Sequence, residues 1–368
     1  YPDAGGKFKF QPPSGFKALS TANLSDPTIK NPKQYFDVLT YAGNNGANTI
    51  NTLGFQPDFV WIKARNGAYN NTLQSSVTGW ASLISNQTLA ESTIAVSPQS
   101  NGFNLNTSNT DWNATGTNYV AWNWKAGGTA VANTQGTIAS QVSANPIAGF
   151  SIVSYTGNGV NGATVGHGLS QTPEFIIEKG RDSAFAWTVQ AGWAWPQLIS
   201  GYSGWQNSLF LNSTNSVNAN SGNGAPTENV FKPSALNYQN ESAKKYIAYV
   251  FHSVPGYSKF GTYTGNGSST DGPFVYTGFR PRYILVKNTT SVGSYYWEVL
   301  DTKTSQYNPA QYRLFPGAPD AEASSNQVDV LSNGFKIKIG DGSDWNTSGA
   351  THIYAAFAEV PFKYANAR

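Results

Sequence analysis

The sequence has no cysteine and no methionine among its 368 residues. Without cysteine, the chain has no disulfide, no zinc–thiolate site and no cysteine nucleophile. No run of residues approaches the ~18 consecutive apolar residues that a membrane span requires, so we expect no membrane span. Because the sequence begins at Tyr1 rather than at methionine, we expect it to be a fragment, a processed product or part of a longer chain.

Charged residues are also scarce. They make up 12% of the chain, about half of the usual share of roughly 25%. The formal net charge is only +3, and no basic run is longer than Lys244-Lys245. Proteins that bind nucleic acid usually gather their basic residues on one face, so we expect no nucleic-acid ligand. The polar surface must come mainly from Asn, Ser, Thr, Gly and Gln, which favour sheets and turns over helices.

A short apolar strand that ends in Tyr-x-Gly-Asn occurs three times. The three tyrosines are Tyr41, Tyr155 and Tyr263, spaced about 110 residues apart, which is the size of a small domain. Gly43, Gly157 and Gly265 follow them, and we expect each to have a positive φ or to pack too closely for a side chain.

Each copy continues in the same way after this turn. A proline precedes a run such as FVWI or YILV, and the run ends at Lys63, Lys179 or Lys287. A near-continuous apolar run predicts a strand that is buried on both faces or lies at a sandwich core. Each copy then closes with an aromatic strand, such as YVAWNWKAG from Tyr119. Asn-Gly precedes a strand in copies one and three, and its counterpart in copy two is expected near Asn229.

These patterns predict an all-β protein of three tandem β-sandwich, jelly-roll-like domains behind an extended, proline-rich N-terminal arm. The expected divisions are an arm over 1–34, repeat 1 over 35–127, a linker over 128–148, repeat 2 over 149–256 and repeat 3 over 257–368. The linker over 128–148 is small and polar, whereas repeats 2 and 3 are joined by only a few residues. We therefore expect repeats 2 and 3 to move as one unit, with repeat 1 hinged on the linker.

The repeated segments also carry a family resemblance. SGFKALSTANLSDPTI, FDVLTY-x-GN, LGFQPDFVWIKAR, SNGF and YVAWNWKAGG together resemble a repeat domain of structural proteins of tailed bacteriophages. In those proteins the repeat often follows a SPRY or concanavalin-like lectin domain, and FKFQPPSGFKAL resembles the exit from one. The resemblance covers nearly the whole chain. It implies a virion structural protein and brings no catalytic residue or ligand with it.

Residues suited to catalysis or metal binding are few. His167, His252 and His352 are the only histidines, and no G-x-S-x-G motif is present for a serine triad. Asp341 and Asp344 are close enough in sequence to bind calcium together, but a polar turn before the closing strand is the favoured interpretation. The sequence thus indicates no catalytic residue, no cofactor and no metal beyond this weak candidate pair.

Tryptophan is concentrated in AWTVQAGWAWPQLISGYSGW of repeat 2. Its candidate ligand-binding residues are Trp193, Trp195, Tyr202 and Trp205, because exposed aromatic rings stack on the C–H faces of sugars. The alternative is that these rings fill a core or an interface. Trp61, Trp122, Trp124 and Trp297 lie in apolar strands and are expected in the core.

The sequence therefore favours a non-enzymatic tail fibre or appendage protein on the surface of a virion, which spaces and displays a host-binding surface. Capsid decoration is the first alternative, and a carbohydrate-binding or carbohydrate-active enzyme fragment is the second. Expected partners are other virion proteins, further copies of the chain and a host surface glycan. A trimer is favoured because phage fibres are usually trimeric.

Overall fold

The computed structural model describes residues 13–14, 23–94, 96–192, 204–219, 224–234, 237–290 and 295–365. Antiparallel strands dominate, and the described residues contain a single short α-helix, α1 (Asn237–Asn240). No helix among these residues is long and apolar enough to cross a membrane. The predicted all-β, sandwich-type fold is confirmed.

Repeat 1 forms two sheets. The larger contains, in spatial order, β1 (Phe36–Ala42), β9 (Asn118–Trp124), β3 (Phe59–Ala64), β4 (Asn71–Ser75), β5 (Ala81–Ile84) and β6 (Ser92–Ile94). The smaller contains β2 (Asn48–Ile50), β8 (Gly102–Leu105) and β7 (Val96–Gln99). The opening strand β1 and the closing strand β9 of repeat 1 are direct neighbours in the larger sheet, since Phe36 pairs with Trp124 and Tyr41 with Tyr119.

Repeat 2 is built on the same plan. Its larger sheet orders β10 (Val131–Asn133), β11 (Ser140–Asn145), β12 (Phe150–Thr156), β19 (Lys245–Phe251), β14 (Phe175–Gly180), β15 (Thr188–Gln190), β16 (Asn207–Phe210) and β17 (Asn218–Ala219). A two-stranded sheet pairs β13 (Val165–Gly166) with β18 (Val230–Phe231). This β18 follows Asn229, where the counterpart of the Asn-Gly strand is predicted.

The predicted linker over 128–148 is wrong. This segment contains β10 and β11, and β11 pairs along its whole length with β12. Val142 and Ile138 are buried in the core of repeat 2. Small polar composition suggested a loose connection, but Ser140 and Ser143 are also buried within the sheet.

Repeat 3 forms two four-stranded sheets. One orders β20 (Ser258–Thr264), β27 (Thr351–Pro361), β22 (Phe279–Asn288) and β23 (Glu298–Asp301). The other orders β21 (Phe274–Tyr276), β26 (Gly334–Ile337), β25 (Ala323–Leu331) and β24 (Ala310–Arg313). A short 3₁₀ turn, η6 (Phe362–Tyr364), follows β27 directly.

The central strands are buried on both faces, as the apolar runs predict. In β3, Val60 and Ile62 face the core between the two sheets of repeat 1. Phe59 and Trp61 point the other way, into a second core. Because side chains alternate along a strand, a run without polar residues requires a partner on each side. β14 and β22 divide their side chains between two cores in the same way.

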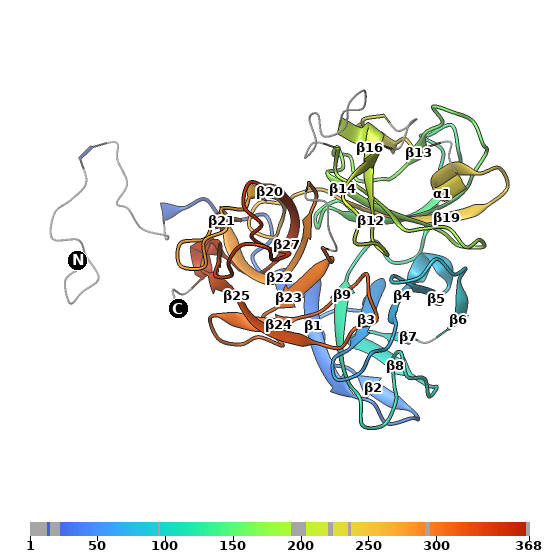
Figure 1. Ribbon diagram of the computed structural model, residues 1–368. Helices are drawn as coiled ribbons and strands as arrows, with labels where there is room; N and C mark the ends of the chain where they lie inside the picture. The colour runs from blue at the N-terminus through green and yellow to red at the C-terminus, as the bar shows by residue number, and fades with distance from the viewer. Residues whose placement is uncertain are drawn as a thin grey trace.

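This second core is shared by all three repeats. Phe59 of repeat 1 stacks on Tyr249 of repeat 2 at 4.3 Å, and Phe36 lies 5.0 Å from Phe357 of repeat 3. Phe175 of repeat 2 stacks on Phe260 of repeat 3 at 5.5 Å. Figure 1 shows the repeats as three lobes around a common centre. The expected hinge between repeat 1 and the others is therefore wrong, because their large sheets bury one another.

The repeated Tyr-x-Gly-Asn turn has a structural explanation. The hydroxyls of Tyr41, Tyr155 and Tyr263 donate to the carbonyls of Trp112, Gln239 and Trp345. A Cβ on Gly43, Gly157 or Gly265 would lie 2.2–2.3 Å from a second carbonyl oxygen in the same loop. These oxygens belong to Ala114, Glu241 and Thr347, each two residues after the carbonyl that the tyrosine binds. None of these glycines has a positive φ, so close packing, the second of the two predicted reasons, is confirmed.

Residues 23–34 of the expected arm lie against repeat 3. Ile29 is buried in the shared core, and the short 3₁₀ turn η2 (Pro32–Gln34) contacts β27. The Lys363 ammonium donates to the carbonyl of Leu24 at 2.8 Å. The segment is thus anchored at both its start and its end.

Candidate functional site

The lysine that ends each central strand lies at a joint between two repeats. Lys63, Lys179 and Lys287 are all fully buried. Each ammonium donates to a carbonyl of another repeat: Lys63 to Pro319 (2.8 Å), Lys179 to Thr88 (3.1 Å) and Lys287 to Thr214 (2.9 Å). Burial lowers the pKa of each lysine to about 8. Repeat 1 thus contacts repeat 3, repeat 2 contacts repeat 1, and repeat 3 contacts repeat 2.

The chain beside each lysine repeats a second contact. Two residues after Lys63, Arg65 binds Glu322 with both ends of its guanidinium, at 2.6 and 2.9 Å. Arg181 binds Glu91 in the same way at 2.8 and 3.1 Å. In the first two joints the backbone N–H of the glutamate also donates to the carbonyl of the arginine. In the third joint the two positions are Val217 and Thr289, which make this backbone hydrogen bond but no ion pair. The three contacts run in one direction around the molecule, so the repeats close a head-to-tail ring.

Buried carboxylates serve the individual repeats. Burial raises the pKa of Glu178 to about 7; its carboxylate accepts a hydrogen bond from the side-chain amide of Gln239, and its other oxygen lies 3.0 Å from the Tyr155 hydroxyl. Burial and the neighbouring Asp344 raise the pKa of Glu298, which pairs with Arg313 at 2.6 Å. Perturbed carboxylates are typical of active sites but also of structural networks. Both lie inside sandwiches, where they hold strands and loops together.

The histidines occupy similar interior positions. Burial lowers the pKa values of His167 and His352 to about 4. His352 stacks on Tyr263 with ring centroids 4.9 Å apart, beside the repeated turn. His252 is also buried.

The candidate metal pair does not converge on one site. Asp341 accepts backbone hydrogen bonds from Gly342 and Ser348, which lower its pKa. Asp344 instead accepts from the backbone of Tyr296 and lies 3.8 Å from Arg313. Within the described ranges, no group of three or more His, Asp or Glu side chains is placed to hold a metal.

Of the candidate tryptophan site, Trp193, Trp195 and Tyr202 lie outside the described residues. Trp205 is partly buried, and its ring lies against the backbone of Gly192. Trp187, from the same stretch, is fully buried and donates to the carbonyl of Ile84 in repeat 1 at 2.8 Å. Trp61, Trp122, Trp124 and Trp297 are buried, as predicted.

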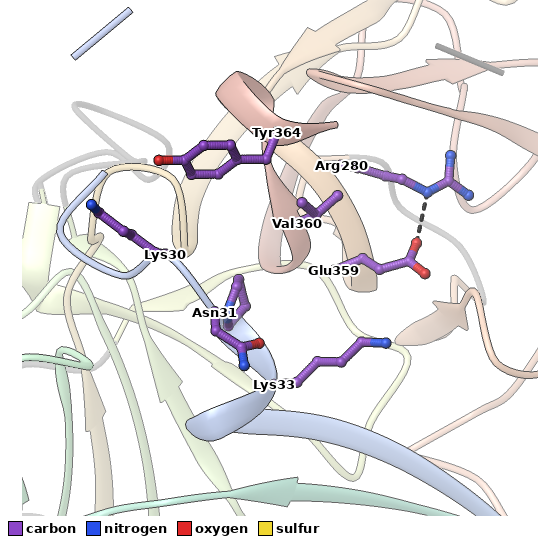
Figure 2. A pocket seen from close by; sticks show the side chains of 8 residues that line it. Lys30, Asn31, Lys33, Arg280, Glu359, Val360 and Tyr364 are labelled. Atoms are coloured by element: carbon purple, nitrogen blue, oxygen red, sulfur yellow. Dashed lines mark hydrogen bonds and ion pairs between the residues drawn. The ribbon is translucent and has the colours of Figure 1, made fainter. Parts of the chain in front are cut away.

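An open pocket of about 440 Å³ lies where residues 30–33, just before β1, meet repeat 3. Repeat 3 contributes Arg280 from β22, Glu359 and Val360 from β27, and Tyr364 from η6. We call this the seam pocket, because it lies where the segment that leads into repeat 1 meets repeat 3. Figure 2 shows Lys30 and Lys33 extending in opposite directions, with Asn31 between them.

The walls of the seam pocket are held in place. Arg280 donates from Nε to Glu359 at 2.6 Å and from a terminal nitrogen to the carbonyl of Val330 at 3.3 Å. Pro32 is buried, and the Tyr364 hydroxyl donates to Asp26 at 3.1 Å. Lys33 is exposed and has no hydrogen-bond or ion-pair partner among the described residues.

The charges of this pocket do not recur in the other repeats. Strand register places Gln56 and Thr172 at the position of Arg280, and Ala126 and Ser253 at that of Glu359. The signal was available in the sequence, because FRPR in repeat 3 stands where repeat 1 has FQPD. What the sequence did not reveal is that residues 30–33 lie beside it, since that contact spans nearly the whole chain.

The family comparison covers the same three repeats. A family model described as a domain of unknown function, DUF7483, matches residues 31–361. A search of curated proteins finds no significant match. The matched range starts within the wall of the seam pocket and ends at the last residue of β27. The chain therefore belongs to the DUF7483 family.

Proposed function

We propose that this chain is a non-enzymatic structural protein of a bacteriophage particle, a tail fibre or other appendage that spaces and displays a host-binding surface. The observation that carries the proposal is the head-to-tail ring of three repeats. The three repeats share the buried lysines, the turn tyrosines and the closely packed glycines, and all of these residues hold the folded structure together. Such a body suits display, because surface loops vary while the frame is fixed.

The resemblance of the repeated segments to phage structural proteins supports the same proposal. So does the low share of charged residues, 12%, which leaves an amide- and hydroxyl-rich surface suited to contacts with sugars or with other virion proteins. A homotrimer is part of the proposal, although one chain already arranges three repeats around a shared core.

The first test is to look for the chain in purified particles by mass spectrometry and to locate it with antibodies by electron microscopy. Labelling of the tail tip or fibres is the expected result, with the soluble chain slowing adsorption to host cells. Light scattering should give three times the chain mass. Absence of the chain from the particle, or from the surface structures with which the particle contacts its host, would contradict the proposal.

Capsid decoration is the second candidate, supported by the anchored segment over residues 23–34. Copy number separates the two, because decoration follows the shell lattice and fibres follow the tail. Incubation with host polysaccharide followed by chromatography tests the enzyme alternative, for which cleavage would be the positive result.

A further inference from the structure

We propose that the seam pocket binds a carboxylated sugar residue of an acidic surface polysaccharide. This inference rests on the proposed function, since it names the chemistry of the host surface to be recognised. The proposed site uses none of the residues of the tryptophan-rich stretch of repeat 2.

The first argument is charge. Three cations line the pocket, namely Lys30, Lys33 and Arg280, and Glu359 is the one carboxylate among its lining residues. Glu359 pairs with Arg280, and Asp26, which is not a lining residue, pairs with Lys30 at 2.9 Å. Lys33 therefore leaves the pocket with one positive charge that no described carboxylate balances. An anionic ligand is therefore attracted to this pocket more than to the average surface.

The second argument is which cation is free. Arg280 is almost fully buried, with 6% of its side chain exposed, and Glu359 occupies its guanidinium. That guanidinium is not available for the two-pronged binding that phosphate groups favour. Lys33 is exposed and unpaired within the described part of the chain, so its ammonium is the group that an incoming carboxylate meets.

The third argument is shape. A volume of about 440 Å³ is far larger than a bare anion needs and falls in the range of small-molecule sites. Tyr364 is 43% exposed, which leaves part of its ring open to the C–H face of a sugar. Asn31 lies between the two lysines and offers an amide to sugar hydroxyls. Ring, amide and ammonium together match an acidic saccharide better than a simple ion.

The fourth argument is that the fold does not require these groups. Repeats 1 and 2 build the equivalent strands without counterparts of Arg280 and Glu359. The Lys33 side chain is exposed and has no hydrogen-bond or ion-pair partner among the described residues. Its substitution therefore tests binding without disturbing stability.

The experiment is calorimetry or saturation-transfer NMR on the full chain with three probes. These are trigalacturonic acid, an α2,8-linked trimer of N-acetylneuraminic acid and neutral maltotriose, with inorganic phosphate as competitor. We expect at least one acidic trimer to bind and maltotriose not to bind. Binding should weaken with added salt, because exposed charges are screened.

Lys33→Gln and Tyr364→Ala should each weaken binding by about tenfold or more, which corresponds to about 1.4 kcal/mol. The matched controls are Lys303→Gln and Tyr307→Ala, which change an exposed lysine and an exposed tyrosine outside the pocket. Melting temperatures should remain unchanged for Lys33→Gln and for both controls.

Three results would overturn the proposal: no binding of either acidic trimer, equal binding of maltotriose, or phosphate displacing the trimer at equal concentration. Loss of binding in the control variants as much as in Lys33→Gln would do so as well. If an acidic trimer binds but the chain is absent from particles, the proposed function fails while this site stands. The reverse outcome removes the site alone.

Discussion

Gly157 lies where a single added carbon meets a backbone carbonyl. A Cβ there would lie 2.3 Å from the oxygen of Glu241. We expect Gly157→Ala to destabilise the protein by about 1–3 kcal/mol, because the strand must move to relieve the clash. Gly46→Ala is the matched control, since nothing lies within 4 Å of its added carbon. Chemical denaturation measures both, and equal stability of the two variants would mean that the carbonyl moves away freely.

Ala243 has a left-handed backbone conformation at a position where the other two repeats have glycine. Gly116 and Gly349 have φ of 81° and 74° at the equivalent positions of repeats 1 and 3, and Ala243 adopts 64°. Left-handed backbone costs a residue with a side chain about 1–2 kcal/mol. We expect Ala243→Gly to stabilise the protein by about 0.5–1 kcal/mol, after the larger entropy loss of glycine on folding. A lower denaturation midpoint would contradict this expectation.

The close packing of the turn glycines could be predicted at this scale because three copies displayed the same residue. The partners of the turn were missed, although DWNATG and DWNTSG are visible in repeats 1 and 3. Their buried asparagines, Asn113 and Asn346, accept the backbone N–H of Asn44 and Asn266. In repeat 2 the equivalent sequence is QNESA, and only its asparagine, Asn240, is shared; its side chain accepts the backbone N–H of Asn158. Comparison of all three copies at that segment would have revealed it.

At the scale of the strand, the three joint lysines link stability to pH. Their pKa values are about 8 in the fold and about 10.4 in an unfolded chain. Between pH 8 and pH 9.5 the unfolded state therefore binds more protons, and the free energy of unfolding rises with pH. The expected rise is on the order of 1 kcal/mol per lysine. Above about pH 10 the unfolded tyrosines ionise first and reverse the trend.

Urea titrations at intervals between pH 8 and pH 9.5 measure this rise. Lys179→Met should remove about a third of the slope, whatever its effect on stability at pH 8. Lys303→Met, at an exposed position, should leave the slope unchanged. A flat profile for the unaltered protein would show that the carbonyls around the ammonium groups keep them charged.

The strands themselves were largely predictable, and their partners were not. FVWI indicated burial on both faces, and β3 has it. The same pattern gave no indication that the second face packs against other repeats, because alternation records that a side chain is buried but not what covers it. The prediction of a linker over residues 128–148 was wrong for the opposite reason. β10 and β11 are held by strand pairing and have few apolar residues, so no apolar run marked them as strands.

At the scale of the whole molecule, the ring predicts tolerance of rearranged connectivity. Lys363 contacts Leu24, so the ends of the segment over residues 23–365 lie side by side. We expect a circular permutant of residues 23–365 to fold when about six Gly/Ser residues join the old ends. Its new ends would lie between Thr129 and Ala130, in the loop between β9 and β10. Exposed loops are where permutation succeeds.

Circular dichroism and thermal melting compare this permutant with the unpermuted chain over the same residues. A melting temperature within a few degrees is the expected result. A permutant opened inside β14, between Ile176 and Ile177, should not fold, because both residues are buried in cores. Failure of the Thr129 permutant alone would show that the joint between repeats 1 and 3 depends on the covalent order of the others.

The neighbouring ends also determine how the molecule carries force. Tension applied between residues 23 and 365 loads first the contacts of Asp26 with Lys363 and Tyr364. It then passes from β1 to β27 through Phe36 and Phe357, which touch directly. None of these contacts involves a residue of repeat 2. A pull along the chain is therefore borne first by contacts of the two ends and of repeats 1 and 3, before it reaches repeat 2 through the shared core.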